Sequence, residues 1–172
     1  MSGGRDSRTP RSQTKQGMRL LEHVTALIGE SENLQETLQS IVDVVAERMQ
    51  TEACSVYLLD TENQNLTLCA TTGLDRGSVG RVKMRTDEGL TGLVIETMEP
   101  VNVPDAPVHD RFKFFPETGE ERLHSFLGVP ILEKRAPLGV LVVQTLRRRD
   151  FTEDEVRLLK MIAGQVSGVL VQ

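Results

Sequence analysis

Apolar side chains recur along this chain with two different periods, which predict where helices and strands form. Over residues 18–29, over residues 34–49 and again after Thr152, apolar positions are three or four residues apart, which is the spacing of an amphipathic helix. Asn33 precedes the second of these segments and Thr152 the last, and each is followed three residues later by a glutamate. This pattern predicts a capping box at the start of both helices.

Between these helices the period of the apolar positions changes to two. Residues 54–60 and 66–74 alternate between two faces, and the polar residues 62–65 between them indicate a hairpin turn. Residues 125–132 and 138–146 are apolar on both faces, which is typical of central strands that are covered on both sides. The remaining predicted elements are a short strand over 81–85, a helix over 89–99 that Pro100 ends, and a short strand over 101–103.

This order of elements predicts an α+β domain on an antiparallel sheet of five to six strands, because the strands follow one another and the long helices lie at the ends of the chain. The terminal helices are expected to cover one face of the sheet. The helix over 89–99 and the proline-rich segment that follows residue 103 are expected to cover the other face. An irregular segment over a sheet is a place where a ligand cavity is expected.

The segment 109–122, HDRFKFFPETGEER, is unusual for this chain. It carries three of the five phenylalanines among seven charged side chains, and it has neither a helical nor a strand period. Two interpretations stay open: the phenylalanines fill a core beneath a loop, or they cap a pocket.

Composition limits the classes of partner. The net charge of −5 offers no basic surface for nucleic acid or for an anionic membrane, and no apolar run approaches the roughly 20 residues of a membrane span. The first residues lack the apolar region of a signal peptide, and the isolated Cys54 and Cys69 are expected to be reduced and buried. A cytoplasmic location is therefore expected. Residues 1–17 hold almost no apolar side chains and are expected to form a disordered tail before a domain over 18–172.

No catalytic or metal-binding motif accompanies these elements. The glycines lack the spacing of a nucleotide-binding loop, and no zinc, metalloprotease or serine-hydrolase pattern occurs. We therefore expect no catalytic residue, no metal site and no cofactor in this chain. Catalysis by Cys54 and Cys69 stays an alternative, although neither has a visible activating base.

Two stretches resemble the GAF domain family. Residues 88–106, EGLTGLVIETMEPVNVPDA, resemble the family signature in which a glycine-bounded helix leads into a short strand and an acidic turn. Residues 139–144, GVLVVQ, followed by Phe151 and Thr152, resemble the final strand and the entry to the last helix. The resemblance covers the chain from about residue 18, and it implies a PAS-related fold with a sensing or interaction role.

Three further stretches resemble one group within this family, the N-terminal GAF domains of nitrogen-related phosphoenolpyruvate-protein phosphotransferases. They are residues 54–60 (CSVYLLD), 111–122 (RFKFFPETGEER) and 125–131 (SFLGVPI). The resemblance implies a regulatory module that couples metabolite status, with glutamine as a ligand candidate, to phosphoryl transfer by downstream domains. The catalytic histidine of that group lies beyond the GAF domain, so this chain is not expected to be a competent enzyme. The GAF domain of nitrogen-fixation transcriptional activators is the nearest alternative.

Two hypotheses about function follow. In the first, an amino-acid-like ligand lies on the sheet beneath Phe112 and Phe114, and Arg111 or Arg122 pairs with its carboxylate. In the second, the chain is a dimerisation and interaction module whose cavity is filled by its own side chains. Small residues in the last helix indicate either tight packing on its own sheet or a homodimer interface formed with the N-terminal helix. The candidate ligand-binding residues are Tyr57, Thr71, Asp105, His109, Arg111, Phe112, Phe114, Arg122 and Phe126.

Overall fold

An antiparallel sheet of six strands lies in the middle of the molecule, with the strand order β3-β2-β1-β6-β5-β4. The structure is a computed structural model that describes residues 10–30, 33–62, 64–119 and 122–171. The two most apolar predicted strands lie inside the sheet and the short ones form its edges, which confirms the expected α+β class. The strands are β1 (Ala53–Asp60), β2 (Asn65–Thr72), β3 (Lys83–Arg85), β4 (Val101–Val103), β5 (Ser125–Glu133) and β6 (Ala136–Thr145).

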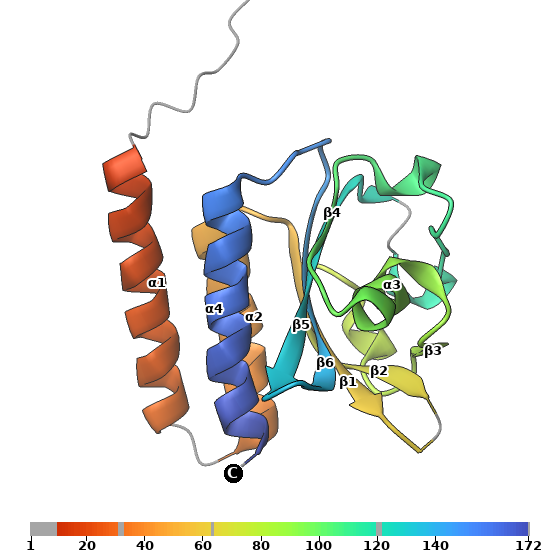
Figure 1. The fold of residues 1–172 in the computed structure, drawn as a ribbon, viewed down its shortest axis with the longest axis horizontal. Helices are drawn as coiled ribbons and strands as arrows, with labels where there is room; N and C mark the ends of the chain where they lie inside the picture. Colours follow the sequence, from red (N-terminus) through yellow and green to blue (C-terminus); the bar gives the residue numbers. More distant parts are fainter. Residues whose placement is uncertain (1–9, 31–32, 63, 120–121, 172) are drawn as a thin grey trace, which may run out of the picture.

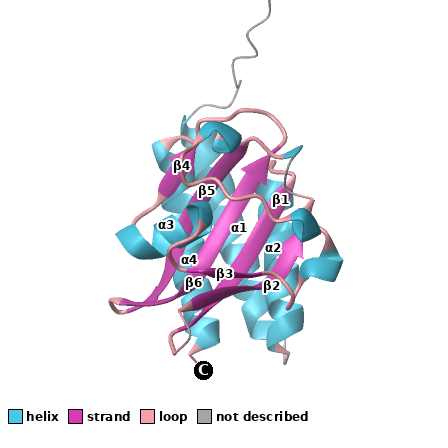
Figure 2. Cartoon of the chain, turned by 90° about the vertical axis from the view of Figure 1, so that its right-hand side faces the viewer, coloured by secondary structure: helices cyan, strands magenta, loops and turns pink. Residues whose placement is uncertain are grey.

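Helices cover the two faces of the sheet unequally (Figure 1). On one side, called here the helix face, α2 packs on β1 and β2, and α4 packs on β5 and β6. α1 lies outside them and contacts α2 and α4, so it forms a further layer. α3 lies on the opposite side, called here the lid face, where loop segments cross the strands (Figure 2). The helices are α1 (Pro10–Glu30), α2 (Leu34–Met49), α3 (Gly89–Thr97) and α4 (Glu153–Leu170).

The alternation predicted for β1 divides its side chains between two cores. Cys54 and Val56 belong to the core on the helix face, and Tyr57 belongs to the core on the lid face. A β-bulge then shifts the register of β2, because Val56 pairs with Ala70 whereas Tyr57 pairs with Leu68. The bulge lets Ala70 join the helix-face core although Leu68, two residues earlier, faces the lid side.

The predicted helix starts are confirmed at their capping residues. The Asn33 side chain accepts a hydrogen bond from the backbone N–H of Glu36 at 3.2 Å. At the start of α4, the Thr152 hydroxyl accepts from the Glu155 backbone at 3.1 Å, and the Glu155 carboxylate accepts from the Thr152 backbone at 3.0 Å. This reciprocal pair is the capping box that the sequence predicted.

The disordered tail expected over residues 1–17 needs correction in its second half. Residues 1–9 lie outside the described residues, but residues 10–17 belong to α1. A helix that has already formed extends by further residues at little cost. Gly17 in α1 also lies close to α4, since a Cβ added there would be 3.5 Å from the Leu158 side chain. Residues 10–17 have too few apolar side chains to predict a helix by themselves, and they continue a helix whose later part packs on α2 and α4.

Candidate functional site

An irregular segment, residues 104–119, lies on the lid face and is called here the lid (Figure 1, green to teal). Phe112 and Phe115 pack against the core of the lid face, whereas Phe114 is 41% exposed. The sequence-based hypothesis places Phe114 inward together with Phe112. The structure places Phe115 there instead, because side chains three positions apart lie on the same side of this bent segment.

The lid leaves little space beneath it. The hollow under Phe112 and Phe115 has a volume of about 10 Å³, which is the room of roughly one water molecule. Pockets for small molecules are typically about 300–1,000 Å³. The lid therefore covers the sheet in a closed arrangement. The residues that line the hollow are Met84, Gly89, Leu90, Thr91, Phe112, Lys113, Phe115 and Phe126.

Two ion pairs hold the lid against α3. The Arg111 guanidinium lies 2.7 Å from the Glu96 carboxylate on α3, and Lys113 Nζ lies 2.5 Å from Glu88, which precedes that helix. These side chains are between 28% and 48% exposed, and such pairs contribute about 0–1 kcal/mol each. The ion pairs orient the lid but contribute little to its stability, and the packing of the partly buried Phe112 and Phe115 contributes more.

The candidate residues in the strands lie on the expected face. Tyr57 on β1 is 3% exposed in the lid-face core, and Phe126 on β5 is 2% exposed and lines the hollow. Thr71 on β2 is fully buried, and its hydroxyl lies 2.8 Å from the hydroxyl of Ser55. Because Ser55 pairs directly with Thr71 and is two residues from Tyr57, both hydroxyls belong to the lid face. Phe112 and Phe126 are the two candidates that the fold brings to the same hollow.

The other charged candidates have partners elsewhere. Arg122 donates a hydrogen bond to the backbone carbonyl of Gly73 at 2.7 Å. His109 Nδ1 accepts from the backbone N–H of Arg111, within its own turn. Asp105 lies 3.1 Å from His124 Nδ1 and 3.1 Å from Arg148 Nε, so it joins the start of the lid to the segment after β6. The structure thus separates the positions that the sequence grouped as possible ligand clamps.

Sequence reasoning missed Lys113, Phe115 and Thr91 as lining residues of the hollow. Lys113 and Phe115 stood in the segment that the sequence singled out, and the Lys113 ammonium lies 5.3 Å from the centre of the Phe115 ring. Only the path of the lid decides which members of this segment point inward. Thr91 lies in the first turn of α3, and the sequence pattern carries no signal for it.

Neither cysteine is prepared for nucleophilic chemistry. Cys54 is fully buried, and burial together with the nearby Asp43 carboxylate raises the pKa of its thiol. Burial also raises the pKa of Cys69. Since the thiolate is the reactive form, both shifts work against catalysis by these residues.

Within the described part of the chain, no cluster of three or more His, Cys, Asp or Glu side chains is arranged to hold a metal ion. None of its helices has both the length and the apolar character that crossing a membrane requires.

The sequence pattern of the GAF domain matches residues 33–170, which is most of the chain. The chain belongs to the GAF domain family. This GAF domain superimposes on the GAF domain from a phosphoenolpyruvate-protein phosphotransferase of Coxiella burnetii with a TM-score of 0.87 and 35% identity. The match covers 91% of this chain and 94% of that one.

This GAF domain is similar to parts of longer proteins from two groups. It is 40% identical over 152 residues to the Escherichia coli protein named phosphoenolpyruvate-dependent phosphotransferase system. This alignment covers 88% of this chain and 20% of the relative. It is 30% identical over 152 residues to the Nif-specific regulatory protein of Azospirillum lipoferum, which covers 83% of this chain and 24% of the relative. The chain thus spans about a fifth to a quarter of the length of these relatives.

Proposed function

We propose that this GAF domain is a regulatory module of a phosphoenolpyruvate-protein phosphotransferase, where it binds a small metabolite and modulates phosphoryl transfer by downstream domains. The observation that carries the proposal is the 40% identity with the phosphotransferase relative, against 30% for the Nif-specific regulator. Both free cysteines are disfavoured as thiolates, so neither is expected to act as a nucleophile in this module, and a cytoplasmic location is part of the proposal.

The proposed ligand is a small metabolite with a carboxylate, and glutamine is the first candidate. It would bind beneath the lid, with Arg111 leaving Glu96 to pair with the ligand carboxylate. Opening the lid exposes Phe112 and Phe115, and each phenylalanine that becomes fully exposed costs about 1.5–3 kcal/mol. An opening cost of about 3 kcal/mol weakens apparent affinity roughly 150-fold, so weak binding is expected.

A thermal-shift titration tests this proposal. Glutamine and related amino acids, at concentrations up to millimolar, are expected to raise the melting temperature of the wild-type domain. Arg111→Ala is expected to abolish the shift. The matched control is Arg157→Ala, because Arg157 is an exposed arginine on α4 that pairs with Asp154. No shift with any compound, or the same shift in Arg111→Ala, would count against a ligand site beneath the lid.

The modulation of phosphoryl transfer is tested in the full-length protein. Autophosphorylation from phosphoenolpyruvate is compared between the intact protein and a form without residues 1–170, with and without glutamine. The proposal requires that the metabolite changes the rate only when the GAF domain is present. An equal response of both forms would assign the sensing to another domain.

The closed hollow favours a second candidate function, a dimerisation and interaction module. With about 10 Å³ beneath the lid, the phenylalanines fill the space that a ligand would need. On α4, Gly164 and Gly168 are exposed, and a Cβ at either position would meet nothing within 4 Å. These glycines are therefore not explained by packing on the sheet, which supports a homodimer through the terminal helices. Sedimentation equilibrium at micromolar concentration tests this function, and a monomer there would contradict it.

A further inference from the structure

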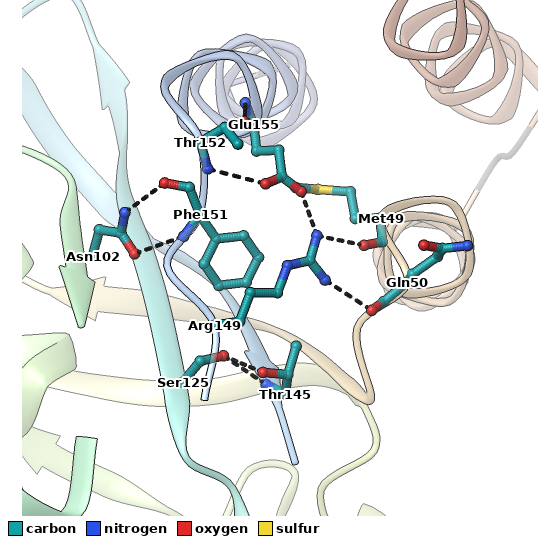
Figure 3. Close-up of polar contacts among 9 residues, drawn as sticks. All are labelled: Met49, Gln50, Asn102, Ser125, Thr145, Arg149, Phe151, Thr152 and Glu155. Carbon is teal, nitrogen blue, oxygen red and sulfur yellow. Dashed lines mark hydrogen bonds and ion pairs between the residues drawn. The ribbon is translucent and has the colours of Figure 1, made fainter. Parts of the chain in front are cut away.

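Residues 146–151 join β6 to α4 and are called here the connector (Figure 3). On the lid side the connector is bound by Asn102, the middle residue of the edge strand β4. Asn102 Nδ2 donates to the Phe151 carbonyl at 2.9 Å, and the Phe151 N–H donates to Asn102 Oδ1 at 3.4 Å. One side-chain amide thus binds both backbone groups of Phe151, much as a neighbouring strand would.

On the helix side the connector is bound through Arg149. Its guanidinium donates to the carbonyls of Gln50 at 3.0 Å and Met49 at 3.2 Å, at the end of α2, and it forms an ion pair with Glu155 in the first turn of α4 (Figure 3). The same group stacks on the Phe151 ring. Arg149 therefore contacts the end of α2, the start of α4 and the ring of Phe151 at once.

A third contact joins the connector to the start of the lid. Arg148 Nε lies 3.1 Å from the Asp105 carboxylate, which also contacts His124. The connector is thus held from the lid side at Asp105 and Asn102, and from the helix side at the ends of α2 and α4.

A hollow of about 240 Å³ lies beside the connector, and three arginines and Glu52 line it together with Gln50 and Thr145. The contacts of this region do not favour an anion. Glu52 accepts from the Leu146 N–H, Asp105 pairs with Arg148, and Glu155 pairs with Arg149. With the carboxylate of Asp150 hydrogen-bonded to Asn102, four acidic groups oppose three arginines. Arg148 and Arg149 therefore bind groups of the protein itself, and the hollow is not favoured as an anion site.

We propose that the connector is a joint through which β4 and the start of the lid set the position of α4 and of the end of α2. Asn102 and Arg149 are the positioning residues of this joint, and Phe151 is its shared part. The Phe151 ring is 4% exposed in the helix-face core, so its backbone cannot move with Asn102 unless the core around the start of α4 moves as well. This inference deepens the proposed regulatory function, since it names the route from the lid to the helix layer.

A double-mutant cycle without any ligand tests whether Asn102 and Arg149 act through one element. Unfolding of Asn102→Ser, Arg149→Lys and the double variant is measured by denaturant titration. Independent sites would give additive effects, whereas the joint predicts that Arg149→Lys raises the unfolding equilibrium constant about tenfold less in the Asn102→Ser background than in the wild type. The control cycle pairs Asn102→Ser with Arg157→Ala and is expected to be additive. Additivity of the Asn102 and Arg149 cycle would overturn the proposal.

Hydrogen exchange tests the transmission itself. Arg111→Ala loosens the lid by removing its pair with Glu96. We expect faster amide exchange in peptides that cover 47–51 and 152–160, and we expect Asn102→Ser to abolish this response to Arg111→Ala. No response in either background, or the same response in both, would contradict the joint. No ligand is used in these two experiments, so their outcome does not depend on whether the metabolite binds. Failure of the metabolite titration and failure of the joint can therefore be told apart.

Discussion

The guanidinium carbon of Arg149 lies 4.5 Å from the centre of the Phe151 ring. This stacking places a positive charge at the end of α2, where the carbonyls of Met49 and Gln50 accept hydrogen bonds from it. A cation at a helix C-terminus is favourable because the last carbonyls and the helix dipole are negative there. The Arg149 side chain thus donates hydrogen bonds to the last carbonyls of α2 and covers the ring of Phe151. It also pairs with Glu155 of the α4 capping box.

Replacement of Arg149 by lysine is expected to destabilise the domain by about 1–3 kcal/mol, because an ammonium cannot reproduce the planar fork or the stacking. For a chain of this size, each kcal/mol lowers the melting temperature by about 2–4 °C. Differential scanning calorimetry checks this value. Arg157→Lys is the control, since its pair with Asp154 is exposed and is expected to change stability by less than about 0.5 kcal/mol. Equal effects of both substitutions would contradict the assigned role of Arg149.

The arrangement of the lid predicts different effects for two neighbouring phenylalanines. Phe112→Ala removes a ring that packs on the lid-face core, and it is expected to cost about 1–3 kcal/mol. Phe114→Ala removes a ring that is 41% exposed, and it is expected to cost about 0.5 kcal/mol or less. Urea unfolding of both variants measures the difference. A larger cost for Phe114→Ala would mean that the lid in solution presents the other ring to the sheet.

The raised pKa of Cys54 predicts a loss of stability at alkaline pH. The unfolded thiol ionises near pH 8.5, whereas the folded thiol keeps its proton well above that pH, so the unfolded state binds fewer protons there. Stability from this group is complete below about pH 8.5 and is expected to fall by up to about 1.4 kcal/mol for each pH unit above it.

The measurement is urea unfolding between pH 7 and 10 for the wild type and for Cys54→Ala, whose difference isolates this thiol from other alkaline groups. Cys54→Ala is expected to have a flatter dependence on pH. Curves that stay parallel up to pH 10 would contradict a thiol that is held protonated in the fold.

Two glycines are expected to respond to alanine in opposite directions. A Cβ at Gly139 on β6 would lie 2.1 Å from the Tyr57 carbonyl oxygen of the adjacent strand, so Gly139→Ala must displace backbone and is expected to destabilise by about 1–3 kcal/mol or more. A Cβ at Gly164 on α4 meets nothing within 4 Å, so Gly164→Ala is expected to stabilise the monomer by about 1 kcal/mol.

Sedimentation of Gly164→Ala separates the roles of this helix. A homodimer that needs close approach of α4 is expected to weaken in the variant even though the monomer becomes more stable. An unchanged association constant would place the dimer interface elsewhere.

The sequence predicted local structure well where short-range physics decides it. The Thr152 capping box and the change from helical to alternating period need only neighbouring residues, and the structure contains both. The prediction for residues 10–17 was wrong because these residues continue α1, and α1 packs on α2 and α4, which are separate elements of the chain. The inward position of Phe115 in place of Phe114 likewise depends on the path of an irregular segment.

By itself the sequence determined the elements, the α+β class and the likeness to GAF domains, because apolar period, capping residues and signature stretches are all properties of adjacent positions. Only the tertiary structure decided that the lid is closed over about 10 Å³, that Arg111 pairs with Glu96, and that Asn102 and Arg149 meet at Phe151. These contacts join segments that are 15 to about 50 residues apart. Which residues meet depends on how the elements pack on the two faces of the sheet, and a pattern of neighbouring residues does not contain that information.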